Sequence, residues 1–424
     1  MLQVSEIRAN KEKVLTGLKK RGLKEVDDKI DEVLALDDKR KSLKTEMDVA
    51  LAEANQLAKQ IGQLMQSGQK EAAEKIKSQT SELKETSKKL GSDLESTEEL
   101  LTNKLYELPN VPHESVPEGR TAEDNEVVFQ VGTLPKLPES AKPHWDLIKE
   151  YDIIDFDLGI KITGAGFPVY KKQGARIVRA MINYFIDQAL DAGYLEMRPP
   201  IVVNKESGYG TGQLPDKEGQ MYHATADDLY LIPTAEVPIT NLYRDVILAD
   251  DELPVKNVAY TPCFRREAGS WGAHVRGLNR LHQFDKVEIV QVTTPEASYK
   301  ALDGMKNHVE RLIKNLELPY RILKLCGGDM GFTSALTFDF EVYSAAQKKW
   351  LEVSSVSNFE TYQANRLKLR RKVDKKTELL HTLNGSALAL PRILAAMLEN
   401  NQTPDGIKIP KVLVPYTGFN MIKK

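Results

Sequence analysis

The sequence predicts an α+β protein in which a long helical hairpin precedes an antiparallel β-sheet domain flanked by helices. Three observations predict this class. None of the 20 prolines lies before Pro109, and Tyr106 is the one aromatic residue in that stretch. Apolar residues recur there every seven positions, as in a coiled coil. Beyond it, short β-favouring runs do not alternate regularly with helices, which disfavours a parallel, doubly wound sheet.

Composition narrows the functional classes. A chain of 424 residues has room for roughly two or three domains. Apolar residues make up 41% and charged residues 28%, which is ordinary for a soluble protein. We find no run of ~20 apolar residues that would span a membrane, and no apolar signal region at the N-terminus. The sequence therefore predicts a cytoplasmic protein without a membrane partner.

Charge and metal-ligand patterns exclude further classes. The net charge of −2 carries no global attraction for nucleic acid, so any polyanion site must be local. Two cysteines, Cys263 and Cys326, are too few for a disulfide framework or a Cys-rich zinc site. The seven histidines show no metal-ligand spacing, and we expect no zinc.

The first element is the predicted hairpin arm, residues 1–108. One apolar series runs to a turn-like break near 62–68, and a second series follows it. Two seams of similar length around a Gly-bearing break favour an antiparallel hairpin, although a dimerising coiled coil remains open. The first seam contains Leu36, Leu43, Met47, Ala50, Ala54, Leu57, Ile61 and Leu64, and the second contains Ala73, Ile76, Leu83, Leu90, Leu94 and Leu101. Lysines near the tip could contact phosphates or simply face water.

The remaining chain divides into a linker and a second domain. Residues 109–120 contain three prolines, which end helices and favour extended backbone. From 121 to 424 we expect the sheet domain, with a helix over about 173–192 followed by a strand that ends at Pro199 and Pro200. Neither GxGxxG nor GxxxxGK[ST] occurs between a strand and a helix, which disfavours those phosphate sites.

A β-hairpin over 261–292 carries the most informative chemistry. Arg265, Arg266 and Glu267 follow an apolar strand, and Phe284 and Glu288 share one face of the returning strand. Guanidinium groups match phosphate oxygens, and an aromatic ring can stack on a base. A hairpin whose charges face water is the alternative for this segment taken alone.

Further along, Arg392 lies on a helix that follows a strand and turn, and the oxygens of Glu352 and Ser355 could bind a divalent cation. With these segments the chain resembles the seryl-tRNA synthetases, a family of the second class of aminoacyl-tRNA synthetases. The resemblance covers essentially the whole chain. It rests on the FRRE hairpin, the helix with Arg392, and the segments TGQLP (211–215), IPTAEVPITN (232–241), RLHQFDKVE (280–288), EVSSVSNFETYQ (352–363) and NGS (384–386).

The resemblance implies the class II synthetase fold, a homodimer that uses the first class motif (the helix and the strand that ends at Pro200), and a two-step reaction. Serine and ATP with Mg²⁺ give seryl-adenylate and pyrophosphate, and the seryl group then passes to the 3′-terminal ribose of serine tRNA, which the arm binds. Whether a selenocysteine tRNA is also charged stays open, as does the role of the Trp271–His274 loop. Two alternatives are an amino-acid activator that serves a carrier protein and a catalytically dead scaffold.

The resemblance also implies site residues. The catalytic set is Arg265, Glu267 and Arg392. The serine-binding set is Thr234, Ala235, Glu236, Arg265, Glu288, Asn384 and Ser386. The ATP-binding set is Arg265, Arg266, Glu267, Phe284, Glu352, Val353, Ser354, Ser355 and Arg392, of which Glu352 and Ser355 would hold Mg²⁺; a salt-bridged strand end is the alternative for this pair.

Overall fold

A computed structural model describes residues 1–131, 134–216, 218–267 and 276–424. The chain forms two compact units. One comprises Leu2–Lys19 and Leu23–Pro109, and the other comprises Met1, Lys20–Gly22 and Asn110–Lys424. Within the described part of the chain, no helix has both the length and the apolar character needed to cross a membrane.

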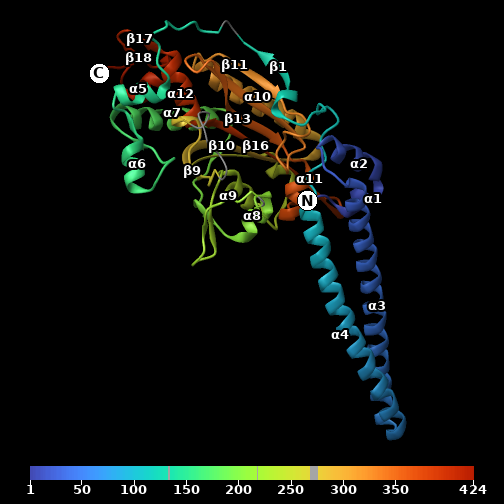
Figure 1. Cartoon of the computed structure of the whole chain (residues 1–424). Helices are drawn as coiled ribbons and strands as arrows, with labels where there is room; N and C mark the ends of the chain where they lie inside the picture. Colours follow the sequence, from blue (N-terminus) through green and yellow to red (C-terminus); the bar gives the residue numbers. More distant parts are fainter. Residues whose placement is uncertain (132–133, 217, 268–275) are drawn as a thin grey trace. The chain divides into compact units, whose positions relative to one another are not determined.

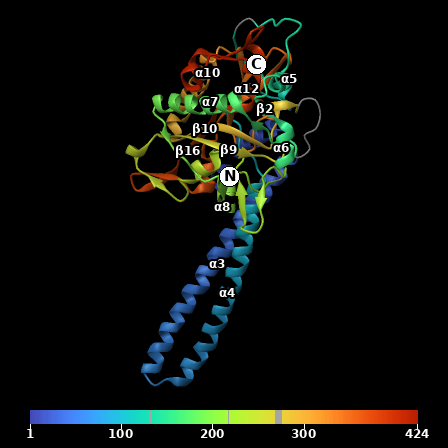
Figure 2. The ribbon, with the colours of Figure 1, turned by 90° about the vertical axis from the view of Figure 1, so that its left-hand side faces the viewer.

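The first unit contains the long hairpin. Helix α3 (Val26–Gln66) and helix α4 (Lys70–Tyr106) run side by side in opposite directions (Figures 1 and 2). Two shorter helices, α1 (Val4–Ala9) and α2 (Lys11–Lys20), precede them. The expected break at 62–68 is too long, because α3 continues through Gly62 and the connection is only 67–69. Gly68 has φ 77°, a left-handed conformation that glycine adopts readily after a helix.

The seam predicted from the heptads is confirmed, and polar residues complete it. Ala50 and Ala54 of α3 and Ala73, Leu94 and Leu101 of α4 are buried, and the other predicted positions are half-buried. The sequence pattern missed three buried polar positions on α4: Thr80, Ser87 and Thr97. The hydroxyls of Thr80 and Thr97 donate to the carbonyls four residues earlier, so both are satisfied inside the seam.

The second unit is built on a large sheet. Among the described residues it has eight strands, in the order β1 (Glu126–Gln130), β11 (Tyr320–Lys324), β12 (Leu336–Ser344), β13 (Lys349–Asn358), β16 (His381–Ala389), β10 (Gln283–Thr293), β9 (Val255–Phe264) and β4 (Leu195–Glu196). Neighbouring strands are antiparallel except for the edge strand β4, which is parallel to β9. The expected antiparallel sheet is therefore confirmed with one parallel edge.

The two faces of the sheet pack against different helices. Helices α7 (Lys172–Asp191), α10 (Ser298–Asn315) and α12 (Leu390–Asn400) contribute to the main apolar core, which includes Val287 and Ile289 of β10. Side chains alternate along a strand, so Glu288 and Val290 point to the other face. There Val290 packs with Ala235 and Ile239 from the segment that forms α9 (Glu236–Asn241).

The predicted helix over 173–192 is confirmed as α7. Shorter elements surround the sheet: α5 (His144–Glu150), β2 (Ile154–Asp155), α6 (Phe156–Ile162), β3 (Val169–Tyr170), β5 (Val202–Val203), α8 (Lys205–Thr211), β6 (His223–Ala224), β7 (Leu229–Leu231), β8 (Ile247–Leu248), α11 (Thr361–Leu367), β14 (Arg370–Val373), β15 (Lys376–Leu379), β17 (Gln402–Thr403), β18 (Gly406–Lys408), α13 (Val414–Thr417) and β19 (Met421–Ile422).

Candidate functional site

Strands β10 and β16 place polar side chains on the face of the sheet opposite the main core. Glu288 of β10 lies across the ladder from Ser386 of β16, and Val290 lies across from Asn384. Cross-strand partners point to the same face, as do residues two positions apart in one strand. Glu288, Asn384 and Ser386 therefore face the same side of the sheet as Lys286.

The carboxylate of Glu288 is buried and fully engaged. It accepts hydrogen bonds from Asn384 Nδ2 at 3.0 Å and from Ser386 Oγ at 3.2 Å. The ammonium of Lys286 lies 2.8 Å from Oε2, and both side chains of this ion pair are almost inaccessible to solvent. A buried charge needs such a partner, because an unpaired carboxylate in this position would be strongly destabilising.

Lys286 connects Glu288 to the segment that precedes α9. Its Nζ donates to Thr234 Oγ1 at 2.9 Å, and this hydroxyl oxygen also accepts from the backbone N–H of Glu236 at 3.2 Å. Ala235 between them is buried against Ala259 and Val290 of the sheet. Lys286 and Glu288 together thus connect three segments that are distant in the sequence.

Glu236 is a second buried carboxylate in this cluster. Burial raises its pKa, and the negative charge of Glu288 raises it further, to about 7. Gln363 of α11 opposes this rise by donating from Nε2 to Glu236 Oε1 at 2.6 Å. The other end of the same amide accepts from Thr382 Oγ1 at 2.7 Å, which fixes its orientation.

The end of the β9–β10 hairpin presents the arginines. Arg265 directly follows β9, and its guanidinium lies 5.4 Å from the centroid of the Phe284 ring, within cation–π range. Its backbone N–H donates to the His282 carbonyl at 2.9 Å, and the side chain is exposed. An exposed guanidinium beside an aromatic face can bind a phosphate while a flat base stacks on the ring.

The next two residues leave the hairpin. The Arg266 side chain is exposed, and its backbone N–H donates to the carbonyl of Gln220 at 2.9 Å. Glu267 adopts a left-handed conformation with φ 49°, and its carboxylate pairs with the guanidinium of Arg280. A non-glycine residue in this conformation is uncommon and often marks a functional turn.

A bulge in β13 brings Glu352 and Ser355 to one face. Residues three apart in a regular strand point to opposite faces. Here Ser355 pairs with Asp339 and Glu352 pairs with Glu341, so Val353 is the extra residue in the ladder. Because Asp339 and Glu341 share a face of β12, their cross-strand partners share it too.

The surroundings of the bulge connect this pair to the cluster around Glu288. Ser355 Oγ donates to Asp339 Oδ1 at 2.6 Å, and burial together with the charge of Glu352 raises the pKa of Asp339 well above its usual range. Ser354 Oγ donates to the carbonyl of Ser386 at 2.6 Å. The carboxylate and hydroxyl oxygens of Glu352 and Ser355 form a hard donor set, which fits Mg²⁺, an ion that keeps several waters and shares its sphere with substrate phosphates.

Arg392 reaches the same region from the first turn of α12. Its Nη1 donates to the backbone carbonyl of Glu352 at 2.8 Å and lies 3.4 Å from the Glu352 carboxylate. Its Nε donates to the carbonyl of Asn279 at 3.0 Å. The guanidinium is therefore held on two sides and remains partly exposed.

The structure brings most sequence-predicted residues into two connected groups. Thr234, Glu236, Glu288, Asn384 and Ser386 form the first group. Glu352, Ser355 and Arg392 form the second, and Arg265 and Phe284 lie together at the end of the hairpin. The Trp271–His274 loop lies outside the described residues.

Sequence reasoning missed three partners of these groups. Lys286 and Gln363 stand inside the quoted segments RLHQFDKVE and EVSSVSNFETYQ, and the period of two along β10 already places Lys286 on the face of Glu288. Asp339 carried no such signal, because only its cross-strand pairing with Ser355 reveals it.

Comparisons with known proteins identify the family of the chain. Residues 1–112 match the family described as the seryl-tRNA synthetase N-terminal domain, and residues 221–401 match the class II core domain of the Gly, His, Pro, Ser and Thr tRNA synthetases. A serine–tRNA ligase of Salinibacter ruber is 49% identical over 100% of this chain and 99% of its own length. One of Chlorobaculum parvum is 46% identical over the full length of both.

Solved structures give the same result. The seryl-tRNA synthetase of Pyrococcus horikoshii, crystallised with ATP, has a TM-score of 0.92 at 33% identity, covering 100% of this chain and 99% of that one. The cytoplasmic serine–tRNA ligase of Naegleria fowleri, in complex with AMP, has a TM-score of 0.88 at 26% identity with the same coverage. From its two family matches and its full-length likeness to these enzymes, the chain belongs to the seryl-tRNA synthetases, a family of class II aminoacyl-tRNA synthetases.

Proposed function

We propose that this protein is an ATP-dependent serine–tRNA ligase. In the first step a carboxylate oxygen of serine attacks the α-phosphorus of ATP, and pyrophosphate leaves. In the second step a hydroxyl of the 3′-terminal ribose of serine tRNA attacks the acyl carbon of seryl-adenylate, and AMP leaves. The full-length similarity to serine–tRNA ligases supports this reaction, and the arrangement around Glu288 supplies its physical basis.

The single observation that carries the choice of serine is the hydrogen-bonded carboxylate of Glu288. Its present partners, an amide and a hydroxyl, show that both of its oxygens accept hydrogen bonds. The hydroxyl of serine can donate to this carboxylate, whereas alanine, which has the same amine but no hydroxyl, cannot. A site built to bond a hydroxyl rejects the analogue without it by roughly 10⁴-fold. Thr234, Ala235, Glu236, Asn384 and Ser386 complete the proposed serine site.

The proposed ATP site lies at the end of the β9–β10 hairpin. Phe284 stacks on adenine, and Arg265 contacts both the α-phosphate and the serine carboxylate, so that it neutralises charge on the two reacting groups. Glu267, held by Arg280, binds adenine or orders its turn, and Arg266 lies beside it. Phosphoryl transfer of this kind depends on positioning and charge stabilisation more than on covalent help from the protein.

The phosphate end of ATP is proposed to lie between β13 and α12. Arg392 contacts the far phosphate, Glu352 and Ser355 would hold Mg²⁺, and Val353 and Ser354 lie between these two residues in the strand. When bound, the ion offsets negative charge on the phosphates. The fit rests on the hard oxygen donors and on their common face of the strand.

The arm and the second unit are proposed to have separate functions, tRNA binding and catalysis. Residues 1–108 form the arm that contacts tRNA, 109–120 the linker, and 121–424 the catalytic domain. The arm tip carries Lys59, Lys70, Lys75 and Lys77, all exposed, which suits phosphate contacts. Serine tRNA is the proposed carrier, selenocysteine tRNA is a further candidate, and the cytoplasm is the proposed location.

We also propose a homodimer through the first motif. Leu195 of the edge strand β4 is 61% exposed, and Ile201 and Val202, which lie next along the chain, are 37% and 39% exposed. An exposed apolar edge of a sheet is a ready site for association. Sedimentation equilibrium should give twice the chain mass, and Leu195→Glu should shift the population to monomer.

ATP–pyrophosphate exchange without tRNA, across the standard amino acids, tests the proposed function. We expect exchange with serine and none above background with alanine. Exchange with another amino acid would contradict the assignment around Glu288. If the protein catalysed exchange with no amino acid and also failed to charge tRNA, the proposed ligase activity would be contradicted.

A further inference from the structure

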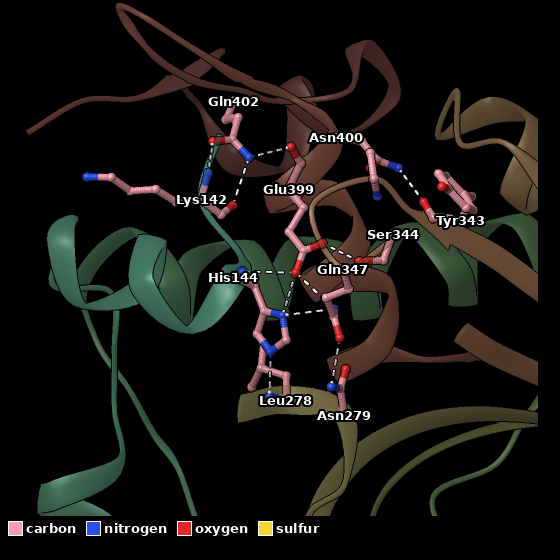
Figure 3. A network of polar contacts seen from close by, with 11 residues as sticks. Lys142, His144, Leu278, Asn279, Tyr343, Ser344, Gln347, Glu399, Asn400 and Gln402 are labelled. Atoms are coloured by element: carbon pink, nitrogen blue, oxygen red, sulfur yellow. Dashed lines mark hydrogen bonds and ion pairs between the residues drawn. The ribbon is translucent and has the colours of Figure 1, made fainter. Parts of the chain in front are cut away.

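A buried hydrogen-bond network connects α12 with α5 and with the turn Gly277–Asn279. Figure 3 shows the part of this network around His144 and Glu399. His144, at the start of α5, and Glu399, near the end of α12, have no side-chain exposure. Glu399 Oε1 accepts from the backbone N–H of His144 at 2.9 Å and lies 2.7 Å from its ring Nδ1. The hydroxyl of Ser344 donates to the second carboxylate oxygen.

The partners of the His144 ring determine where its proton lies. The backbone N–H of Leu278 donates to Nε2 at 2.9 Å, so Nε2 must be an acceptor. The ring proton is therefore on Nδ1, where it is donated to Glu399. In this neutral form, the imidazole connects a buried carboxylate to the backbone of the turn.

A second path reaches the same turn. Gln347 Nε2 donates to Glu399 Oε1 at 2.9 Å, and its Oε1 accepts from Asn279 Nδ2 at 3.0 Å. The Asn279 carbonyl then accepts from Arg392 Nε at 3.0 Å. Since Arg392 and Glu399 are seven positions apart in α12, they lie on one side of the helix. The network therefore forms a closed circuit from Arg392 through the turn and back to its own helix.

Close packing shows that the turn is shaped around α5. Gly277 has φ 68°, and a Cβ at this position would lie 2.3 Å from His144 Nε2. The next contact comes from Trp145, whose ring centroid lies 4.7 Å from the guanidinium carbon of Arg276. Two consecutive residues of α5 thus contact two consecutive residues at the start of the turn.

We propose that His144 and Glu399 are positioning residues that hold the Asn279 carbonyl, and through it the Arg392 guanidinium, in the orientation that binds the phosphate end of ATP. The inference rests on the proposed role of Arg392. Burial raises the pKa of Glu399, but the hydrogen bonds from His144 and Ser344 outweigh it and keep the pKa below its usual value. Glu399 is thus an ionised acceptor with fixed donors, which suits an orienting group.

Two substitutions of His144 separate the two ring contacts in the full-length protein. Asparagine can place its amide nitrogen where Nδ1 lies, so His144→Asn keeps the bond to Glu399 and loses the acceptor for Leu278. Glutamine can place its oxygen where Nε2 lies, so His144→Gln keeps the acceptor. We expect His144→Asn to weaken ATP binding about tenfold, because a misplaced binding group costs affinity in this way, and His144→Gln to stay within about twofold of wild type.

Calorimetric titration with ATP and the KM values for ATP and serine in pyrophosphate exchange provide the readouts. His308→Asn is the matched control, because this buried histidine lies on α10 and contacts Arg311 rather than the turn. The control should lower the melting temperature without changing the affinity for ATP. A positioning role predicts that the KM for ATP rises while the KM for serine stays unchanged. Simple destabilisation of the fold would not produce this selective change.

The outcomes keep this inference distinct from the proposed function. A folded His144→Asn protein with wild-type ATP affinity would overturn it, and so would equal losses in both histidine variants. If His144→Asn does not fold, Gln347→Leu, which breaks only the second path, should weaken ATP binding and leave serine binding unchanged; wild-type ATP affinity there would overturn it too. Wild-type protein that binds ATP but exchanges no amino acid would contradict the proposed function, while the titration would still decide the inference.

Discussion

The carboxylates of Glu236 and Glu288 belong to one buried cluster, and the charge of Glu288 adds to burial in raising the pKa of Glu236 to about 7. The two residues come from α9 and β10, and they are connected through the backbone N–H of Glu236, the Thr234 hydroxyl and the Lys286 ammonium. A pair of carboxylates with one ammonium leaves one negative charge incompletely balanced. We predict that the ammonium of bound serine supplies the further positive charge.

This relationship predicts a pH dependence of serine binding. In the proposed site, the serine ammonium pairs with the ionised form of Glu236, so we expect serine binding below pH 7 to release a proton. We expect the dissociation constant for serine to rise by up to about tenfold for each pH unit below 7 and to be level from pH 7.5 to 8.5. Calorimetry in two buffers of different ionisation enthalpy measures the proton released. A dissociation constant that is flat from pH 5.5 to 7.5 would show that Glu236 does not titrate against the substrate.

Lys286 is predicted to be essential for stability as well as for the site. Lys286→Met removes the ammonium that pairs with Glu288 and leaves a buried charge, which should cost about 3 kcal/mol of unfolding free energy. Urea denaturation measures the loss. Lys286→Met combined with Glu288→Gln should recover much of the stability but not serine-dependent exchange. Equal stability of the single and double variants would mean that the two charges are not coupled.

The hairpin arm could be predicted from the sequence because the heptad repeat along each helix already shows which residues pack between the two helices. Leucines and alanines at heptad spacing identify a seam without knowledge of any partner. The same reasoning did not identify Thr80, Ser87 and Thr97 as buried, because polar residues are expected on the solvent-exposed face of a helix. It also placed a break at Gly62, where the helical hydrogen bonds outweigh the conformational freedom of glycine.

The candidate site could be predicted only in part. Alternation along β10 put Phe284 and Glu288 on one face, which the ladder confirms. The common face of Glu352 and Ser355 depends on the bulge at Val353, and regular spacing would have separated them. The circuit through His144 and Glu399 depends on contacts between residues 255 positions apart, and no local pattern reports such a contact.

Arg392 is predicted to be required for adenylate formation. The guanidinium contacts both the Glu352 carbonyl and the Asn279 carbonyl, a forked geometry that a lysine ammonium cannot reproduce. We therefore expect Arg392→Lys and Arg392→Ala each to reduce pyrophosphate exchange at least about 100-fold, without large loss of stability because the side chain is partly exposed. Wild-type-like exchange by the alanine variant would remove Arg392 from the site.

The arm is predicted to act in the second step alone, and the pairing of its helices shows where to cut it. Glu32 pairs with Lys104, and Gly91 lies against Met47. Removing residues 48–90 and joining Met47 to Gly91 through a short glycine-rich loop therefore keeps the helices in register. The buried residues at the base of the hairpin, Val26, Ile30, Val33, Leu94, Leu101 and Leu105, all remain.

Serine-dependent pyrophosphate exchange by this shortened protein should equal that of wild type, because no residue of the candidate site is removed. The kcat/KM for charging serine tRNA should fall by roughly 100-fold, since a tethered second contact raises effective affinity by about that factor. A matched variant with Lys59, Lys70, Lys75 and Lys77 changed to Gln should show part of the loss, and the wild-type advantage over it should shrink as salt is raised. Loss of exchange in a folded, shortened protein would contradict the division of work between the arm and the catalytic domain.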